Sequence, residues 1–406
     1  MNPSPDPTVL SGFSRRSFFR YAAGASIAAG MPILTEAHLA MASIPIKFAD
    51  PNKGIHIDAN ENPLGPSEAA RKAIVDVVPR GGRYLMNLEQ DLAETFAKQE
   101  GLSADNIRVY AGSSEPLHYT VLAFTSKDKP LVIADPGYEA PMWAASAIGA
   151  PVLKVPLADP QGAATHDIKA MVAAASNPGV IYICNPNNPT GTCTPRADLE
   201  SAVATAPRGS VLLIDEAYIH LCDQPRSLDF VKEGKDVIVL RTFSKLYGLA
   251  GIRMGFAIGR PDLLEKLDTF GRNMLPITAM VAAKASLDEA DLVPARKKII
   301  AGTRTETIAW LKSNGYAVTP SESNCFMVDT KRPGKQVQAA LAAKEMFVGR
   351  IWPAWPTQLR ITVGTSSEMM AFRKAFTEVM SNSTAGMEMP SLHGGRFGKG
   401  QYTFWS

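Results

Sequence analysis

Seven short apolar runs, alternating with helix-length segments, restrict the fold of this 406-residue chain more than any other feature. Each run has the length of a strand, and most are rich in β-branched side chains, which is typical of buried strands. Strands that alternate with helices favour a mostly parallel sheet with helices on both faces. We therefore predict an α/β fold whose large domain surrounds a seven-stranded sheet, built from Ile107–Ala111, Leu131–Ala134, Val152–Val155, Val180–Cys184, Val211–Ile214, Val237–Leu240 and Met254–Ile258.

The pattern changes after about residue 288. A long helix studded with Lys and Arg is followed by strand-like runs at Cys325–Asp329 and Leu359–Val363 and by a closing helix. We predict a large domain over 71–288 and a smaller α+β domain over 289–381, which the N-terminal segment 43–70 completes. The tail, 382–406, is rich in Gly and Ser and lacks periodicity, so we expect it to be disordered.

The N-terminus resembles a twin-arginine export signal. Residues 14–20 read SRRSFFR, an apolar run follows at Tyr21–Leu34, and Ala40 and Ala42 form a small-x-small cleavage pattern. The run is shorter than the roughly 20 apolar residues that a stable membrane anchor needs. We expect residues 1–42 to be removed, the protein to be periplasmic or secreted, and the folded part to begin after about residue 43. A basic, amphipathic surface helix is the alternative.

Charge and cysteine content exclude several classes of function. The 42 Lys and Arg residues nearly balance the 39 Asp and Glu residues, without long basic runs, so nothing points to a nucleic-acid partner. The four cysteines show no CxxC pairing and the six histidines are scattered. We expect neither a metal site nor a disulfide framework.

Polar residues gather directly after five of the predicted strands. In an open α/β sheet, ligands bind outside the carboxyl ends of the strands, so these five loops predict one shared pocket. Ordinary turn chemistry is the alternative for any one of them, because Gly, Pro, Asn and Asp are common in loops. The loops are GSSE (112–115), DPGY (135–138), NPNNPTG (185–191), DEAY (215–218) and SK (244–245).

The GSSE loop has the composition of a phosphate cradle. Backbone N–H groups and the hydroxyls of Ser113 and Ser114 stand at a predicted helix start, where an anion is favoured. Arg253, in a Gly-rich loop, supplies a second candidate contact, although a surface ion pair is its alternative. Neither a nucleotide P-loop nor a GxGxxG motif is present.

Lys245 and Asp215 follow two different buried strands. A lysine at such a place is partly desolvated, which makes its amine nucleophilic. A buried carboxylate needs a cationic partner, and a protonated ring nitrogen would be one. Together with the phosphate cradle and an aromatic ring at Tyr138, these residues describe a pyridoxal-phosphate site.

The chain as a whole resembles the fold-type I pyridoxal-phosphate aminotransferases, which are class I/II aminotransferases, and most closely their histidinol-phosphate aminotransferase branch. The resemblance runs from about residue 50 to 380. Its matching motifs are NENPLGP (60–66), AGSSE (111–115), DPGYEAP (135–141), NPNNPTG (185–191), DEAY (215–218), RTFSKLYGLAGIRMG (241–255), SNCFMV (323–328) and LRITVGT (359–365).

The resemblance implies a role for each matching residue toward pyridoxal 5′-phosphate. Lys245 would form the internal aldimine and then move the substrate's proton, and Asp215 would hold the pyridinium. Asn188 and Tyr218 would bind the phenolic oxygen, while Tyr138 would stack on the ring. The phosphate would be held by Ser113, Ser114, Ser244 and Arg253, with Tyr84 reaching the cofactor phosphate of the neighbouring subunit in a homodimer.

The resemblance also implies how substrate is bound. Arg360 would clamp the substrate α-carboxylate, and Asn60 would lie near the substrate; a domain-packing role is the alternative for Arg360. Trp352 and Trp355 depart from the family pattern, and we expect them to bring aromatic surface toward the pocket mouth.

The function implied is transfer of an amino group between an amino acid or amino-phosphate and a 2-oxo acid. A pyridoxal-phosphate enzyme that catalyses decarboxylation, oxidation or elimination is the first alternative. A non-enzymatic periplasmic amino-acid binder is a distant one, because simple binding has no use for a buried nucleophilic lysine. An exported enzyme would not serve cytosolic histidine biosynthesis as its main role.

Overall fold

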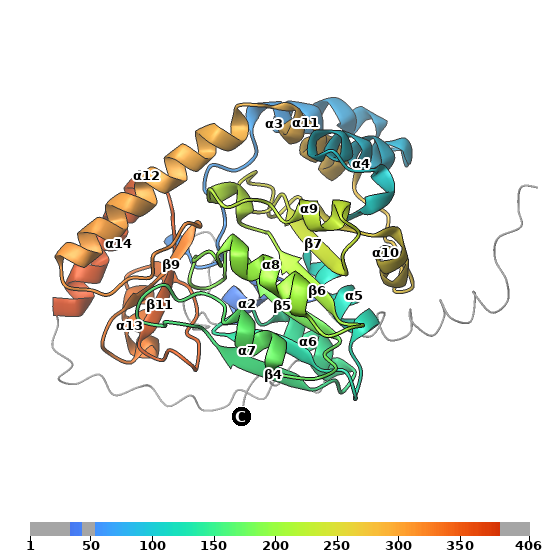
Figure 1. Ribbon diagram of the computed structural model, residues 1–406. Helices are drawn as coiled ribbons and strands as arrows, with labels where there is room; N and C mark the ends of the chain where they lie inside the picture. The colour runs from blue at the N-terminus through green and yellow to red at the C-terminus, as the bar shows by residue number, and fades with distance from the viewer. Residues whose placement is uncertain (1–32, 43–52, 382–406) are drawn as a thin grey trace, which may run out of the picture.

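The computed structural model describes residues 33–42 and 53–381 (Figure 1). The SRRSFFR motif and the tail from residue 382 lie outside the described residues, so both predictions about them remain predictions. Among the helices of the described ranges, none combines the length and the apolar character needed to cross a membrane.

A seven-stranded sheet forms the centre of the molecule, in the order β2-β8-β7-β6-β5-β3-β4. β8 runs antiparallel to both of its neighbours, and the other neighbouring pairs are parallel. All seven predicted runs form this sheet, which confirms the predicted fold class. Its strands are β2 (Ile107–Tyr110), β3 (Leu131–Asp135), β4 (Val152–Pro156), β5 (Val180–Cys184), β6 (Val211–Asp215), β7 (Val237–Thr242) and β8 (Gly255–Gly259).

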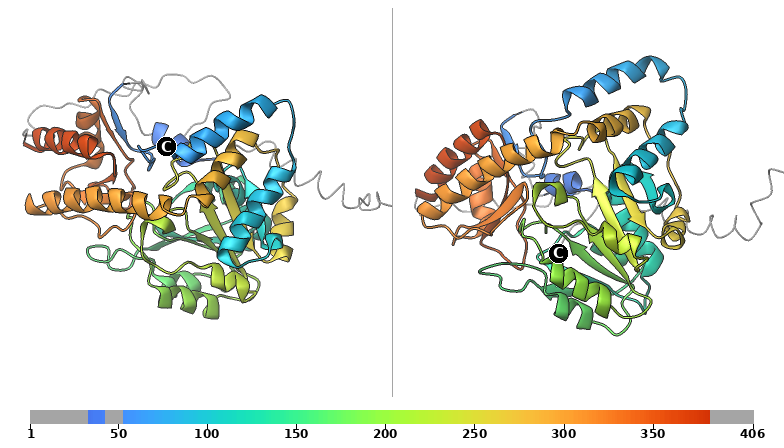
Figure 2. Two further views of the ribbon diagram at one scale, coloured as in Figure 1. Left: turned by 90° about the horizontal axis from the view of Figure 1, so that it is seen from above. Right: turned by 45° about the horizontal axis from the view of Figure 1, so that its top comes forward.

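Helices cover both faces of this sheet, as the apolar character of its strands requires. Every residue of β5, β6, β7 and β8 is buried. Helices α5, α6 and α10 pack on one face, while α7 and α8 lie on the other (Figures 1 and 2). The helices of this part are α5 (Ser114–Phe124), α6 (Ala140–Ala147), α7 (Ile168–Ala173), α8 (Arg196–Thr205), α9 (Leu228–Lys232) and α10 (Pro261–Asp268).

Three further helices lie beside the sheet, where α11 (Ile277–Asp288) packs against both α3 (Glu68–Val77) and α4 (Asn87–Glu100). Leu92 and Phe96, one turn apart on α4, are both buried. The helix ends at Gly101, whose φ of +66° is the left-handed conformation that glycine adopts without strain. The sequence pattern predicts this helix at Leu88–Gln99, one residue shorter at each end.

The long helix α12 (Leu292–Ser313) leads into a smaller α+β unit (Figure 1). There β9 (Cys325–Asp329) pairs antiparallel with β11 (Gln358–Thr362), and α13 (Gly334–Ala342) and α14 (Ser366–Ser381) pack together. The strand β1 (Ile55–Ile57) pairs in parallel with β10 (Met346–Val348), so a segment from the N-terminal part of the chain joins this unit. The exact domain boundaries stay a prediction.

Residues 33–42 are folded into the molecule, which corrects the expectation that the fold begins after about residue 43. The short helix α2 (Glu36–Met41) begins at Thr35, which forms a capping box with His38. Leu34 and Ala40 are buried, at 8% and 2% exposure. The apolar pattern could not reveal this, because the segment is held mainly by an acid, Glu36, whose partner Arg350 lies 314 residues away.

Candidate active site

A cavity of about 250 Å³ opens at the carboxyl ends of the central strands. The five loops predicted to meet there do meet, which agrees with the general position of ligands in open α/β sheets. Of the residues predicted to bind the cofactor, all except Tyr84 line this cavity: Ser113, Ser114, Tyr138, Asn188, Asp215, Tyr218, Ser244, Lys245 and Arg253. Tyr84 lies on the surface instead, at 74% exposure.

Lys245 follows β7 and projects into the cavity, where its side chain is buried. Its Nζ donates to the carbonyl oxygen of Ala59 at 3.2 Å and lies 5.7 Å from the centre of the Tyr218 ring. Burial lowers the pKa of this amine, and the charge of Glu36 opposes that shift. Lowering the pKa increases the share of neutral, nucleophilic amine at a given pH.

Asp215 ends β6, the strand that pairs in parallel with β7, and so lies at the same edge of the sheet as Lys245. Its carboxylate accepts hydrogen bonds from the Tyr182 hydroxyl at 2.9 Å and from the Ala217 amide at 3.1 Å. Burial raises the pKa of Asp215 to about 6. Neither donor is a cation, so the acid can still accept a positively charged ligand. Sequence reasoning missed Tyr182, because a tyrosine inside an apolar run reads as core.

The serines and Arg253 form a concave group at the start of α5. Arg253 donates to the Ser244 hydroxyl at 3.3 Å and to the carbonyl oxygen of Ala111 at 3.2 Å. A Cβ atom on Gly112 would lie 2.1 Å from the Arg253 guanidinium, so glycine is required at that position, whose φ is +88°. Arg253 therefore faces the cavity, and the alternative of a surface ion pair is wrong for this residue.

Asn60 supports Tyr218 from behind. Its side-chain amide donates to the Tyr218 hydroxyl at 3.0 Å, and its side-chain carbonyl accepts from the Thr362 hydroxyl at 3.0 Å. Asn60 is fully buried, whereas Tyr218 lines the cavity. Because the Tyr218 oxygen accepts from Asn60, its own proton remains available for donation into the cavity.

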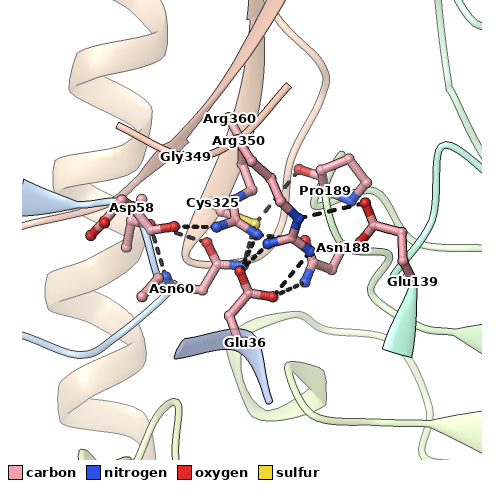
Figure 3. A network of polar contacts seen from close by, with 12 residues as sticks. Glu36, Asp58, Asn60, Glu139, Asn188, Pro189, Cys325, Gly349, Arg350 and Arg360 are labelled. Atoms are coloured by element: carbon pink, nitrogen blue, oxygen red, sulfur yellow. Dashed lines mark hydrogen bonds and ion pairs between the residues drawn. The ribbon is translucent and has the colours of Figure 1, made fainter. Parts of the chain in front are cut away.

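Arg360 lies on β11 and is fully buried. Its Nη1 donates to the side-chain oxygen of Asn188 at 2.9 Å and its Nη2 to the carbonyl oxygen of Asp58 (Figure 3). Its Nε has no hydrogen-bond partner among the described residues. The arginine thus points at the cavity wall from the smaller unit, held in place by backbone and amide groups.

A second arginine, which sequence reasoning missed, stands beside it. Arg350 is 7% exposed, and its Nη2 lies 2.7 Å from Oε2 of Glu139. The Trp352 ring lies beneath both guanidinium groups, at 4.5 Å from Cζ of Arg350 and 5.5 Å from Cζ of Arg360. Trp352 is buried, at 1% exposure, so the expectation that it brings aromatic surface to the pocket mouth is wrong.

Trp355 also lies away from the cavity mouth. It lines a separate hollow together with residues of β3 and β4, among them Asp135 and Lys154. The physical reason is that the chain turns between the two tryptophans. Trp352 packs against the guanidinium groups of the arginines, whereas Trp355 lines the separate hollow.

Glu36, from the segment predicted to be removed, occupies the space between the two arginines (Figure 3). Its Oε1 lies 2.5 Å from Nη1 of Arg350 and 2.7 Å from Nη1 of Arg360, and its Oε2 accepts from Asn188 at 3.0 Å. Burial would raise the pKa of this acid, but the two arginines outweigh that effect and lower it to about 2. The site therefore binds a carboxylate as its anion.

The cavity joins four chemical capacities. Its lining presents a buried amine, an acid suited to a cationic ring atom and a hydroxyl-rich cradle suited to a phosphate, and behind Glu36 of the lining stands a pair of arginines that bind its carboxylate. Within the described ranges, His, Cys, Asp and Glu side chains form no group that could hold a metal ion.

Comparison with known proteins places this geometry in a family. Residues 52–376 match the model of aminotransferase class I and II. The histidinol-phosphate aminotransferase of Moorella thermoacetica is 32% identical over 338 residues, which cover 80% of this chain and 86% of that protein. The aromatic amino acid aminotransferase of Mycolicibacterium smegmatis is 33% identical over 326 residues, covering 78% and 88%.

The same relationship holds for solved structures. The crystal structure of histidinol-phosphate aminotransferase from Sinorhizobium meliloti, in complex with pyridoxal-5'-phosphate, is similar to this chain with a TM-score of 0.75. The sequence identity is 25%, and the match covers 91% of this chain and 99% of the other.

Proposed function

The chain belongs to the class I and II aminotransferases, and we propose that its cavity binds pyridoxal 5′-phosphate and transfers an amino group between an amino acid or amino-phosphate and a 2-oxo acid. The observation that carries this proposal is the placement of Lys245 and Asp215 on one cavity, with the arginine pair bound to Glu36 and Asn188 of its lining. Simple binding would require the arginines alone, whereas the buried amine and acid serve chemistry.

The residues present fit this cofactor. Asp215 is a buried acid whose pKa of about 6 shows that its ionised form lacks full compensation, and a protonated ring nitrogen would supply it. The start of α5 and Arg253 line the cavity together, which only a glycine at position 112 permits, and a phosphate would fit there. The hydroxyls at this place come from Ser113, Ser114 and Ser244.

Each residue then has a defined task. Lys245 would hold the cofactor through its amine and afterwards accept and return the proton of the substrate carbon. Asp215 would keep the ring nitrogen protonated, Tyr138 would stack on the ring, and Tyr218 and Asn188 would donate to its phenolic oxygen. When bound, the cofactor supplies an electron sink for the bond that breaks. Arg360 would orient the substrate through its carboxylate.

The substrate proposed is an amino acid or amino-phosphate with an acidic group that reaches the arginine pair. Relatives named histidinol-phosphate aminotransferase and aromatic amino acid aminotransferase support this range. The alternatives of decarboxylation, oxidation or elimination use the same cofactor residues. Dependence on a 2-oxo acid separates them from transamination, and a colourless protein would indicate the non-enzymatic binder.

The test is a panel of amino acids and amine phosphates mixed with the purified holoenzyme, with and without 2-oxoglutarate. A donor alone should convert the cofactor from its pyridoxal to its pyridoxamine form, and added 2-oxoglutarate should reverse the spectrum. Borohydride reduction should place the label on Lys245. A label on another lysine, or product formation that never consumes an oxo acid, would contradict the proposal.

We also propose that the protein is exported by the twin-arginine route and acts outside the cytosol. The SRRSFFR motif supports this, and the route carries folded proteins, so the cofactor could be loaded first. Replacing Arg15 and Arg16 together by Lys should retain yellow, active enzyme in the cytosol. Finding the wild type uncleaved in the cytosol would instead make histidinol phosphate the leading substrate.

A homodimer is the proposed assembly. Tyr84 stands 74% exposed and outside its own chain's cavity, as expected of a residue that reaches the cofactor phosphate of a second subunit. Sedimentation at assay concentration tests this, since a fully active monomer would remove both the dimer and the role of Tyr84.

A further inference from the structure

The N-terminal helix α2 places an acid where the proposed substrate carboxylate binds. Two arginines and one amide converge on the two oxygens of Glu36, and the acid is 9% exposed. Thr35, Glu36 and Ala37 line the same cavity as Lys245. Glu36 is therefore inside the site, on the partners that an incoming acid would need.

Further contacts hold the segment there. The Leu34 amide donates to Nε2 of His118 at 3.3 Å, and Nδ1 of His118 lies 2.8 Å from the carbonyl oxygen of Ser114. Burial lowers the pKa of His118 to about 4, which leaves the ring neutral and able to accept at one nitrogen while donating at the other. Leu34 and Ala40 add buried apolar surface. The segment thus docks by several groups along its length.

A purely structural ion pair would not require this place. Glu139 already lies beside Arg350, and Asn188 and the Asp58 carbonyl already bind Arg360. The additional acid comes from helix α2, which lies on the N-terminal side of the proposed cleavage position after Ala42. Whether the leader is present or removed would therefore decide whether Glu36 occupies the cavity.

We propose that residues 33–42 act as a built-in pseudo-substrate, whose Glu36 carboxylate occupies the substrate carboxylate position between Arg350 and Arg360. The inference rests on the proposed function. Substrate and segment exclude each other, so the uncleaved chain has a lowered affinity for acidic substrates. Removal of the leader after Ala42 frees both arginines, and the enzyme reaches full affinity only after export.

The experiment uses the intact full-length holoenzyme, with its mass verified, and succinate as the probe. Succinate carries carboxylates but no amino or oxo group, so it binds without turnover. Glu36→Gln removes the negative charge while keeping the size of the side chain. The matched control is Glu265→Gln, which makes the same change on the exposed face of α10, away from the cavity.

Calorimetry should show that Glu36→Gln binds succinate about tenfold more tightly than the wild type. The reason is that the Glu36 carboxylate no longer competes with succinate for the two arginines. The KM for the donor found in the panel should fall by a similar factor with kcat unchanged. Glu265→Gln should match the wild type in both. Equal succinate affinity in the wild type and in Glu36→Gln would overturn the proposal.

Hydrogen exchange on the wild type gives a second measurement that needs no variant. Since competition is reciprocal, saturating succinate should displace α2 and speed exchange of its amides about tenfold, while the amides of α10 stay unchanged. Unchanged or slower exchange in α2 would overturn the proposal even if Glu36→Gln failed to fold.

The two proposals fail in different ways. A yellow enzyme that transaminates normally, yet shows no competition between succinate and α2, would overturn the pseudo-substrate and leave the function intact. A protein that neither forms the pyridoxamine state nor consumes a 2-oxo acid with any donor would overturn both, because no substrate would remain to imitate.

Discussion

The two walls of the cavity are built in different ways. The wall that carries Lys245 and Asp215 consists of loops that directly follow neighbouring strands of one sheet. The opposite wall brings together Glu36, Asn188 and the arginine pair, and Glu36 and Arg350 are 314 residues apart in sequence. The first wall is therefore formed by repeated strand-and-loop units of a single sheet. The second exists only when three distant segments meet.

The two walls should therefore respond differently when one of their side chains is replaced. Residues of the sheet wall are positioned by backbone pairing, such as the parallel register of Cys184 with Asp215, and replacing one side chain leaves the others in place. Residues of the arginine wall hold one another through charge, so a change at one alters the cost of burying the rest. We therefore expect changes in the sheet wall to affect chemistry, and changes in the arginine wall to affect binding and stability together.

The largest effect should follow from Lys245→Ala. Loss of the amine removes both the covalent attachment and the proton transfer, so the rate of transamination should drop about 10⁴-fold or more. Borohydride should no longer fix the cofactor to the protein, which mass spectrometry would show. Activity within tenfold of the wild type would contradict the role of this wall in catalysis.

Asp215→Asn should lower kcat/KM about a thousandfold, because the ring nitrogen loses the charge that keeps it protonated. The cofactor-free protein should respond in the opposite direction. Burial raises the pKa of Asp215 to about 6, so ionisation penalises the folded state as pH rises from about 4 through 6. Above that range, Asn should stabilise the empty protein by about 3 kcal/mol.

Denaturant unfolding of the cofactor-free wild type and variant at pH 4 and pH 8 tests this pH dependence. The stability difference should be present at pH 8 and small at pH 4, where both side chains are mostly neutral in the folded protein. If the cofactor-free variant were less stable than the wild type at pH 8, Asp215 would already have a cationic partner in the empty protein. The proposed pairing with a protonated ring nitrogen would then be contradicted.

Arg360→Lys should raise the KM for an acidic donor about 100-fold, with a smaller effect on kcat. Lysine keeps the charge but lacks the planar guanidinium, whose Nη1 contacts Asn188 and Glu36 while its Nη2 donates to the Asp58 carbonyl. Arg260→Lys, in a surface ion pair with Asp262, is the matched control and should change neither constant. An equal loss in kcat would mean that Arg360 contributes to catalysis, as the residues of the sheet wall do.

The sheet wall is predictable from sequence for a physical reason. Strands and the loops that follow them are local patterns, so the positions of SK, DEAY and GSSE along the chain are enough to place them at one sheet edge. Arg360 is also predicted, through its resemblance to a family motif. Glu36, Arg350 and Tyr182 are missed, since a charged residue near the N-terminus, one in a loop and a hydroxyl within an apolar strand carry no local sign of their distant partners.

The smallest effect concerns the acid stability of the arginine wall. The pKa of Glu36 is lowered to about 2, so its ion pairs stabilise the folded chain fully above pH 4.5, and this contribution is lost as pH falls toward 2. Glu36→Gln should therefore cost about 3 kcal/mol at pH 7 and about half of that or less at pH 3. For a chain of this size that amounts to a few degrees in Tm.

Scanning calorimetry of the full-length wild type and Glu36→Gln between pH 7 and pH 3 would measure this difference, with Glu265→Gln expected to follow the wild type throughout. A gap in Tm that narrows with falling pH would show that the charge of Glu36, rather than the packing of α2, holds residues 33–42 in the cavity. A constant gap would assign the stability to Leu34 and Ala40 instead. The arginine wall would then resemble the sheet wall, because packing and backbone contacts rather than charge would hold its residues in place.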